Sequence, residues 1–506
     1  MNSKIQYSRT PSYYLPVGVP PNSLAMALLN KHQELALRAL QALPPQSCLF
    51  STRVQDNGHM SNTSRPLNGL LIGTASAATQ IEGGDTNNNW YEWAQGPNIA
   101  DGSTPFRAND HWNRWREDNE LMSELGFPIA RIGLEWSRIE PEPGHFDHAV
   151  IDRYREELAD LKERGIKPLV TLHHFSNPLW LERNGQWTNP LSIKAFLRYV
   201  RYVVRALSDL VDEWVTINEP NVYATQAHLF REGPPGNVSM RDTLKVMRHM
   251  AIAHLYAYEL IHSITPDATV TIAHHLRSFA PLNPNNPWHK FLTSADSYLF
   301  QDQLTEAFGK GKFGPVMGRS PVPEGRYVDV IGLNYYSRTA VDRLKDGTFP
   351  DVPLNDLGWE IYPQGLVECS KDLNERLGVP VWITENGCAD NGDANHLESF
   401  RPKFLADHLG AILDSSVPIE RYYHWCFVDN WEWSDGEIPR FGIVYNDYET
   451  QRRIVKPSSR MLSEIVKSGE LSSDIIARYT AGQTYRTPST INRVGTKHTS
   501  DPQEKP

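Results

Sequence analysis

The chain has 506 residues, a formal net charge of −10 and 40% hydrophobic residues, which is typical of a folded globular protein. The negative charge and the lack of a basic stripe argue against a nucleic-acid partner. No apolar run approaches about 18 residues, so the sequence predicts no membrane-spanning helix and no membrane partner.

The first part of the chain, residues 1–66, is predicted to be an N-terminal extension that is partly helical or flexible. The stretch from Ser23 to Leu43 lies between two Pro-Pro pairs, which favours a helix. The first acidic residue is Glu34, and such an acid-poor start resembles an organelle transit peptide. A poorly ordered leader and a helix docked on the main domain are the alternatives.

The four cysteines include no CxxC pair, which indicates a reduced compartment. No apolar core of a secretory signal is evident near the start, so the cytoplasm is the expected location, with organelle targeting as the alternative. Cys388 lies three residues after Glu385. Because no base is evident beside it, we interpret it as a buried structural thiol.

From residue 69 the chain alternates between predicted strands and helices. The strand segments are Leu70–Gly73, Ile129–Leu134, Pro168–Leu172, Trp214–Asn218, Thr269–Ala273, Val328–Asn334, Val381–Thr384 and Arg421–Trp425. The helical segments between them include Asp147–Arg164, Leu191–Val211, Arg241–Ile264 and Pro363–Leu377. This alternation predicts the α/β class and a single (β/α)8 TIM barrel with long βα loops over residues 67–470. A doubly wound open sheet is less favoured, because no glycine-rich nucleotide loop follows the first strand.

Two further segments depart from the alternation. Leu276–Tyr327 is long and rich in proline near its start, so we expect an excursion that lines the mouth of the site. Residues 471–506 are polar and are predicted to form a flexible C-terminal tail.

Two glutamates end matching apolar, β-branched runs. Glu219 stands in the sequence TINEP and Glu385 in ITENG. A carboxylate that follows a buried strand and precedes Pro or Gly lies at the rim of a barrel, where parallel α/β folds place their chemistry. The two positions therefore predict a facing pair of carboxylates.

Other polar and aromatic residues cluster in or just after the ends of the predicted strands. The set comprises Gln80, Arg131, Glu135, His173, His174, Asn218, Asn334, Tyr336, Trp425 and Glu432. Donors, acceptors and aromatic plates together suit a polyhydroxylated ligand. The His173-His174 pair does not favour a metal site, because adjacent strand residues face opposite ways and no third ligand is apparent. We predict no metal and no cofactor.

Through a series of sequence motifs, the chain from about residue 69 to 468 resembles glycoside hydrolase family 1, the β-glucosidase and β-galactosidase family. The matching motifs, in order, are GTASAATQIEGG, RIGLEWSRIEP, TLHHFSNPLWL, TINEP, IGLNYY, ITENG and HWCFVDNWEWSDGEIPRFGIV. The resemblance implies a retaining β-glycosidase that hydrolyses terminal β-D-glycosyl residues, with β-glucosides, β-galactosides and β-fucosides as candidates. The expected partners are small-molecule β-glycosides or short β-linked oligosaccharides, and a homo-oligomer is compatible with the sequence.

The resemblance also implies residue roles. Glu385 is the expected nucleophile and Glu219 the expected acid/base. Arg131 and Tyr336 are expected beside Glu385, where they keep it ionised. The negative charge of Glu385 is then expected to raise the pKa of Glu219. Retention needs the two carboxyl groups about 5–5.5 Å apart.

The sugar-binding residues implied by the resemblance surround this pair. Gln80 and Glu432 are expected to bind the outer hydroxyls, and His174 and Asn218 those nearer the anomeric centre. Trp425 is expected to stack under the ring, with Trp433 and Phe441 at its edge. An anionic Glu432 would repel a phosphate, so we expect unphosphorylated substrates.

The sequence departs from the family pattern at Thr79 and Phe175, where an aromatic residue and a tryptophan are common. Both departures are expected to affect hydroxyl preference and not the carboxylate pair. Two alternatives to hydrolysis stay open: an inactive sugar-binding pseudo-glycosidase, which the presence of both glutamates argues against, and an enzyme that is mainly a transglycosylase.

Overall fold

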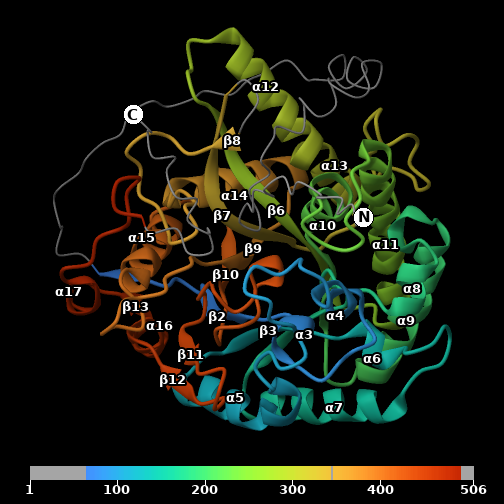
Figure 1. The fold of residues 1–506 in the computed structure, drawn as a ribbon, viewed down its shortest axis with the longest axis horizontal. Coiled ribbons are helices and arrows are strands. Elements are labelled where there is room, and N and C mark those ends of the chain that lie inside the picture. The colour runs from blue at the N-terminus through green and yellow to red at the C-terminus, as the bar shows by residue number, and fades with distance from the viewer. Residues whose placement is uncertain (1–63, 343–345, 492–506) are drawn as a thin grey trace, which may run out of the picture.

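The computed structural model describes residues 64–342 and 346–491 (Figure 1). The helix predicted over Ser23–Leu43, most of the predicted N-terminal extension and the end of the predicted tail lie outside these described residues.

The centre of the molecule is a closed barrel of parallel strands, which confirms the predicted fold class (Figure 1). The barrel order is β2, β3, β4, β5, β6, β7, β9 and β10, and pairing of β10 with β2 closes it. The strands are β2 Leu71–Ala75, β3 Ile129–Gly133, β4 Lys167–Thr171, β5 Glu213–Asn218, β6 Thr269–Pro281, β7 Ile331–Val341, β9 Val381–Asn386 and β10 Ile419–Trp425.

Helices follow the strands and surround the barrel (Figure 1). The α-helices are α3 Ala78–Ile81, α4 Asn89–Ala94, α5 His111–Leu125, α6 Trp136–Ile139, α7 His148–Glu163, α8 Leu179–Arg183, α9 Leu191–Leu207, α10 Pro220–Thr225, α11 Met240–Ile264, α12 Pro287–Ser297, α13 Gln303–Lys310, α14 Pro363–Leu377, α15 Arg401–Leu413, α16 Pro457–Ser468 and α17 Ser473–Thr480. Short turns of other helix types are η1 Gln186–Thr188, η2 Gln226–Phe230, η3 Tyr298–Asp302 and η4 Trp433–Asp435.

Local sequence explains where the long helices begin and end. The Asp147 side chain accepts hydrogen bonds from the first turn of α7, and Ser239 does the same for α11. Such caps satisfy backbone N–H groups that have no partner inside the helix. α14 begins at Pro363 and ends at Gly378, which takes the left-handed conformation that suits a glycine.

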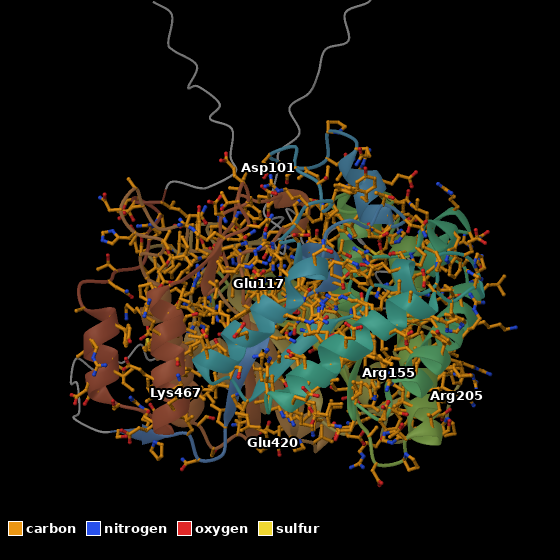
Figure 2. All side chains as sticks on the ribbon, turned by 90° about the horizontal axis from the view of Figure 1, so that it is seen from below. Asp101, Glu117, Arg155, Arg205, Glu420 and Lys467 are labelled. Carbon is orange, nitrogen blue, oxygen red and sulfur yellow. The ribbon has the colours of Figure 1, made fainter. Side chains whose placement is uncertain are left out.

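Charged side chains cover the outer face of the helical layer. Figure 2 views the molecule from the side of α5 and α7 and shows Glu117, Arg155 and Arg205 on this layer. Among the described residues, no helix is long and apolar enough to cross a membrane.

The strands are buried on both faces, so alternate residues enter two different cores. Ala130 and Ile132 of β3 pack outward against the helices, whereas Ile129 belongs to a separate cluster with Leu169 and Val215 inside the barrel. Side chains at odd positions of β3 therefore point inward. This alternation turns Arg131 toward the barrel axis and toward the site described below.

A buried ion pair fills the amino-terminal end of the barrel. Arg421 donates to both carboxylate oxygens of Glu213, and its guanidinium lies 3.7 Å from the ring centroid of Trp382. Lys167 Nζ lies 2.6 Å from Glu213 Oε1. The charges are thus paired, as buried charges need to be.

β6 and β7 are longer than predicted and continue together beyond the barrel. They stay paired as far as Pro281 and Val341, and β8 Asp346–Gly347 pairs with the end of β7. α12, η3 and α13 follow β6, with α12 beside the extended strands (Figure 1). The predicted excursion over Leu276–Tyr327 is therefore a strand extension followed by helices, because its start keeps the strand periodicity of β6.

The C-terminal boundary also differs from the prediction of a tail from residue 471. β13 Glu470–Leu471 pairs with β1 Arg65–Pro66, and α17 begins at Ser473. Ser472 caps α17, and Ile475 is buried. The cap and the buried side chain hold this short helix in place. The overall polar composition of the segment gave no sign of it. A further pair of short strands is β11 Val444–Asn446 and β12 Arg453–Val455.

A buried histidine joins α5 to α7. His111 Nδ1 lies 2.8 Å from Asp118 Oδ2, and His111 Nε2 lies 3.0 Å from Glu157 Oε1. Burial alone would lower the pKa of His111, but Glu157 and Asp118 outweigh it and raise the pKa to about 9. Both contacts therefore stabilise the protonated imidazolium.

We predict that the stability contributed by His111 depends on pH. Its pKa rises from 6.5 to about 9 on folding, so the contribution is complete below pH 6.5 and is lost as the pH rises through about 9. At ~1.4 kcal/mol for each tenfold change in proton affinity, this corresponds to on the order of 3 kcal/mol. Thermal unfolding of the wild type and His111→Gln should differ most at pH 6 and least at pH 10. A difference that does not change with pH would contradict the prediction.

Candidate active site

Arg131 ties Glu385 to the neighbouring strands at the carboxyl end of the barrel. Arg131 Nη1 donates to Glu385 Oε1 at 2.6 Å, and Nη2 donates to Asn218 Oδ1 at 2.7 Å. Arg131 Nε donates to Thr171 Oγ1 at 3.0 Å. The Tyr336 hydroxyl donates to the other oxygen of Glu385, Oε2, at 2.7 Å. Both oxygens of Glu385 are thus held by donors from β3 and β7.

Glu219 lies at the junction between β5 and α10. Its backbone φ is 42° and ψ is 60°, a left-handed conformation that strains a residue with a side chain. Pro220 begins α10, where it loses nothing because the first helical N–H has no partner inside the helix. The Glu219 N–H donates to the carbonyl of Ala273 at 2.8 Å. This sharp turn projects the carboxyl from the strand end, which explains the local sequence around Glu219.

Two asparagines connect Glu219 to the Arg131 cluster. Asn334 Nδ2 donates to Glu219 Oε1 at 2.9 Å and to Asn218 Oδ1 at 3.0 Å. The Thr384 hydroxyl donates to Asn334 Oδ1 at 2.7 Å. The two glutamates are therefore joined by a buried network of amides and one guanidinium, and their positions are not independent.

The position two residues after Glu385 requires a glycine, Gly387. A Cβ atom at this position would lie 2.0 Å from the carbonyl oxygen of Trp425. Only glycine permits this approach of the two strand ends. The Trp425–Cys426 peptide bond at the same place is cis.

The residues predicted to bind a sugar lie next to one another beside this network. Gln80 Nε2 donates to Glu432 Oε2 at 3.2 Å, and Trp425 Nε1 donates to Glu432 Oε1 at 3.2 Å. The ring of His174 is nearly parallel to those of both Trp425 and Trp433, with interplanar angles of 24° and 21°. Asn218 Nδ2 lies 3.0 Å from His174 Nε2.

An aromatic wall forms the other side of the site. Tyr336 meets the ring of Phe441 edge-on at 6.2 Å. Trp359 contacts both rings, at 5.7 Å from Tyr336 and 6.0 Å from Phe441. The predicted residues Gln80, Arg131, His174, Asn218, Glu219, Tyr336, Glu385, Trp425, Glu432, Trp433 and Phe441 thus occupy one continuous set of contacts.

Several buried polar atoms in this set or next to it have no hydrogen-bond partner within the described part of the chain. They include Gln80 Oε1, His174 Nδ1 and Asn430 Nδ2. Buried polar atoms without a partner are costly. Hydroxyl groups of a bound sugar can both donate and accept, so they can satisfy such mixed atoms.

The two departures from the family pattern lie at the edge of this set. The Thr79 hydroxyl donates to Glu135, a buried carboxyl whose other donors include Ser176. Phe175 packs against Trp433 at 5.2 Å and lines an apolar pocket together with Tyr223. Neither residue makes a hydrogen bond to Glu219 or Glu385 in the described structure.

The two glutamates influence each other's protonation. Burial raises the pKa of Glu385 to about 7; Arg131 opposes this rise, and the charge of Glu219 adds to it. Burial also acts to raise the pKa of Glu219, but His275 and Asn334 outweigh it, and the net direction is downward. The expectation that Glu219 has the raised pKa was therefore wrong for the ligand-free protein. The negative charge of Glu219 thus disfavours ionisation of Glu385, and the protonation of one group depends on that of the other.

The protonation of Glu432 also differs from the expectation that this residue is anionic. Burial raises the pKa of Glu432 to about 8, and the nearby charges of Asp435 and Glu385 add to the rise, whereas donors from Trp425 and Gln80 oppose it. The carboxyl is thus largely protonated in the ligand-free site at neutral pH. An anionic Glu432 was assumed from the sequence because its burial could not be known.

His275 was missed by the sequence analysis. His275 Nδ1 lies 2.9 Å from Glu219 Oε1, on a part of β6 that continues past the predicted strand end at Ala273. The signal was present, because His275 and Arg277 are alternate polar residues at the carboxyl end of a strand. Asn334 was recognised as a strand-end residue, but its contact with Glu219 was not foreseen. No group of three or more His, Cys, Asp or Glu side chains in the described ranges has a metal-binding arrangement.

Comparison with known proteins gives consistent results. The chain matches the model of glycosyl hydrolase family 1 over residues 64–320 and 324–471. It is 31% identical to β-glucosidase A of Thermotoga maritima over 436 residues, covering 80% of this chain and 98% of that protein. It is 28% identical to the β-galactosidase of Saccharolobus solfataricus, covering 81% of this chain and 96% of that protein. The solved β-glycosidase from Pyrococcus horikoshii superposes with a TM-score of 0.74 at 32% identity, covering 82% of this chain and 98% of that one.

We predict that Glu432→Gln stabilises the ligand-free protein. The folded-state pKa of Glu432 is raised from 4.5 to about 8, so folding favours the neutral carboxyl and becomes less favourable as the pH rises from 4.5 toward 8. Gln is neutral at every pH and avoids this cost, which at ~1.4 kcal/mol for each tenfold change in proton affinity is on the order of 4 kcal/mol at pH 8. The unfolding temperature of the variant should exceed that of the wild type at pH 8, and the gain should shrink near pH 4.5. Equal unfolding temperatures at pH 8 would disprove a neutral buried Glu432.

Proposed function

Because the chain belongs to glycosyl hydrolase family 1, we propose that it is a retaining β-glycosidase that removes terminal β-D-glucosyl residues from small glycosides or short oligosaccharides, and accepts galactosyl and fucosyl residues. The observation that carries the proposal is the pair Glu219 and Glu385. One carboxyl contacts a permanent cation, and the other ends a strained turn with its own neutral donors. A double displacement needs such a chemically unequal pair.

In the first step, a Glu385 oxygen attacks the anomeric carbon and forms a covalent glycosyl–enzyme bond. The bond between this carbon and the leaving oxygen breaks, and Glu219 gives its proton to that oxygen. Arg131 and Tyr336 then hold the ester oxygens of Glu385 that they contacted before the reaction.

In the second step, the deprotonated Glu219 removes a proton from water, whose oxygen attacks the same carbon. The ester bond to Glu385 breaks, and the sugar leaves with its original β configuration. If a sugar hydroxyl takes the place of water, the same step gives transglycosylation, so that activity is part of the same proposal.

The shared proton of the pair accounts for the protonation states that the first step needs. In the ligand-free protein the pKa of Glu385 is raised, chiefly by burial, and that of Glu219 is lowered, because its hydrogen-bond partners outweigh burial. A bound glycosidic oxygen accepts a hydrogen bond from protonated Glu219, and positive charge that develops at the anomeric carbon favours an ionised Glu385. Substrate binding thus moves the proton between two groups that already share it, and no proton from solvent is required.

The sugar-binding roles follow from the contact set. Glu432 and Gln80 face the outer hydroxyls, and His174 with Asn218 faces those nearer the anomeric centre. Trp425 offers an aromatic plate beneath the ring. Because Glu432 is neutral in the ligand-free site, it can donate as well as accept. Unphosphorylated sugars remain the proposed substrates, since a dianionic phosphate would lie next to the carboxyl groups of Glu432 and Asp435.

A non-catalytic sugar-binding protein is the competing function. Such a protein needs the stacking and hydroxyl-binding residues but has no use for a strained Glu219 or for a buried guanidinium on Glu385. The strain at Glu219 costs on the order of 1–3 kcal/mol, which favours a catalytic role for the pair.

The first test concerns turnover and the roles of the two glutamates. We expect the wild type to release nitrophenol from 4-nitrophenyl β-D-glucoside, and Glu385→Ala to lose turnover because it lacks the nucleophile. Azide should restore activity to Glu385→Ala as the α-glycosyl azide, since the small anion attacks from the vacated face. In the matched variant Glu219→Ala, azide should instead give the β-glycosyl azide. No turnover of any nitrophenyl β-glycoside by the wild type would reject the enzyme, and exchanged azide products would reverse the two roles.

The second test concerns pH. The first step needs one proton on the pair, and the pKa that reports its loss is about 7. We therefore expect kcat/KM for an alkyl β-glucoside to fall above about pH 7, tenfold for each further pH unit. A profile that stays flat to pH 9 would show that the acid proton is not governed by this pair.

A further inference from the structure

A histidine on β6, His275, contacts the proposed acid/base, Glu219. His275 Nδ1 and Asn334 Nδ2 both lie 2.9 Å from the same oxygen, Glu219 Oε1. His275 is 5% exposed, so this contact is shielded from water. No described residue donates to the second oxygen of Glu219, Oε2, which leaves that oxygen to face a ligand.

The hydrogen-bond partners of His275 define its tautomer. Arg277 Nε lies 3.4 Å from His275 Nε2. A guanidinium can only donate, so Nε2 accepts and Nδ1 carries the ring hydrogen of the neutral imidazole. His275 Nδ1–H therefore donates to Glu219. The two residues are alternate positions of β6, which places both on the same face of the strand.

Packing fixes the ring as well. His275 lies parallel to Tyr336 at 6.0 Å with an interplanar angle of 19°, and Phe300 of η3 meets its ring edge-on at 5.9 Å. Gln301, next to Phe300, accepts from the Arg277 N–H at 3.0 Å. The ring of His275 thus contacts Glu219 directly and also stacks on the tyrosine that donates to Glu385.

We propose that His275 is a positioning residue for the acid/base: it holds Glu219 Oε1 through Nδ1–H, so that Oε2 presents the proton to the glycosidic oxygen. Arg277 secures the tautomer of His275. This inference rests on the proposed function, and it adds a specific role to the strand extension that carries His275 beyond the barrel rim.

The charged and titratable groups around Glu219 determine how the contact acts. They are Arg131 on β3, His174 after β4, His274, His275 and Arg277 on β6, Tyr336 on β7, Glu385 on β9 and Glu432 after β10. Among them, His275 is the only titratable side chain with a described hydrogen bond to Glu219. Its donation favours the ionised carboxylate, which is the form that must remove a proton from water in the second step.

The test compares leaving groups. An alkyl glucoside needs protonation of its leaving oxygen, whereas 2,4-dinitrophenolate leaves without it. We expect His275→Phe to lower kcat/KM for octyl β-D-glucoside by about tenfold to a hundredfold, and for 2,4-dinitrophenyl β-D-glucoside by less than about threefold, since general acid catalysis is absent there. The basic limb of the octyl glucoside profile should also move to higher pH, because the variant no longer favours the ionised Glu219.

Three further variants make the result decisive. His275→Asn places an amide nitrogen at the position of Nδ1, because both atoms are bonded to Cγ, and it should restore most of the octyl glucoside activity. His274→Phe is the matched control: it replaces the adjacent buried histidine, whose Nε2 faces the carbonyl of Gln301 and not the glutamates, and it should change both substrates equally. If His275→Phe does not fold, His275→Ala is measured in the same way.

Each outcome decides the matter. An equal loss on both glucosides in the His275 variants would show a structural role only, and an unchanged octyl glucoside rate would show no role; either result overturns the inference. Both are distinguishable from a failure of the proposed function, in which the wild type itself would turn over neither glucoside.

Discussion

The buried guanidinium of Arg131 is the constraint on which the rest of the site depends. A cation that is fully shielded from water must be paired and hydrogen-bonded, or the fold cannot contain it. Arg131 on β3 meets this need by contacts to Thr171, Asn218, Thr384 and Glu385, which come from β4, β5 and β9. Closure of the barrel brings these strands around one axis. The same closure therefore stabilises the cation and assembles the site.

The second carboxyl is attached to this centre through amides and not through a charge. Asn218 accepts from Arg131, and Asn334 donates to both Asn218 and Glu219. Glu219 consequently contacts Asn334 and His275, whereas Glu385 accepts from the guanidinium of Arg131. In water this difference would matter little, but inside the barrel each contact acts at low dielectric. The two chemically identical side chains therefore have different surroundings.

The protonation of the site could not be inferred from residue types alone. Arg131 was expected to keep Glu385 ionised, but burial and the charge of Glu219 raise its pKa to about 7 all the same. Glu432 shows the same effect with a pKa of about 8. The carboxyl groups of Glu219, Glu385 and Glu432 lie in one buried site, and the charge of one affects the pKa of another. The desolvation of one depends on how many neighbours surround it, which is a property of the packed site.

The predicted element boundaries agree with the structure where the periodicity of apolar residues is strong, and they disagree where it is interrupted. The strands β3, β4 and β5 begin within a residue of their predicted starts, and α14 agrees at both ends. β6 was predicted to end at Ala273 because polar residues follow it, although these residues continue the strand to Pro281. His275 was lost with that boundary. The short helix α17 was taken for part of a polar tail, since a single apolar turn stands out little from its surroundings.

The sequence by itself determined the barrel, the two glutamates at strand ends and the residue types around them, because strand periodicity and turn chemistry are local properties of the chain. Only the tertiary structure decided that His275 contacts Glu219, that Asn334 bridges the two halves of the site, and how far burial raises the pKa of Glu385. These features depend on side chains from β5, β6, β7 and β9 that meet across the barrel axis. Such contacts are set by closure and packing, and no local pattern in the chain encodes them.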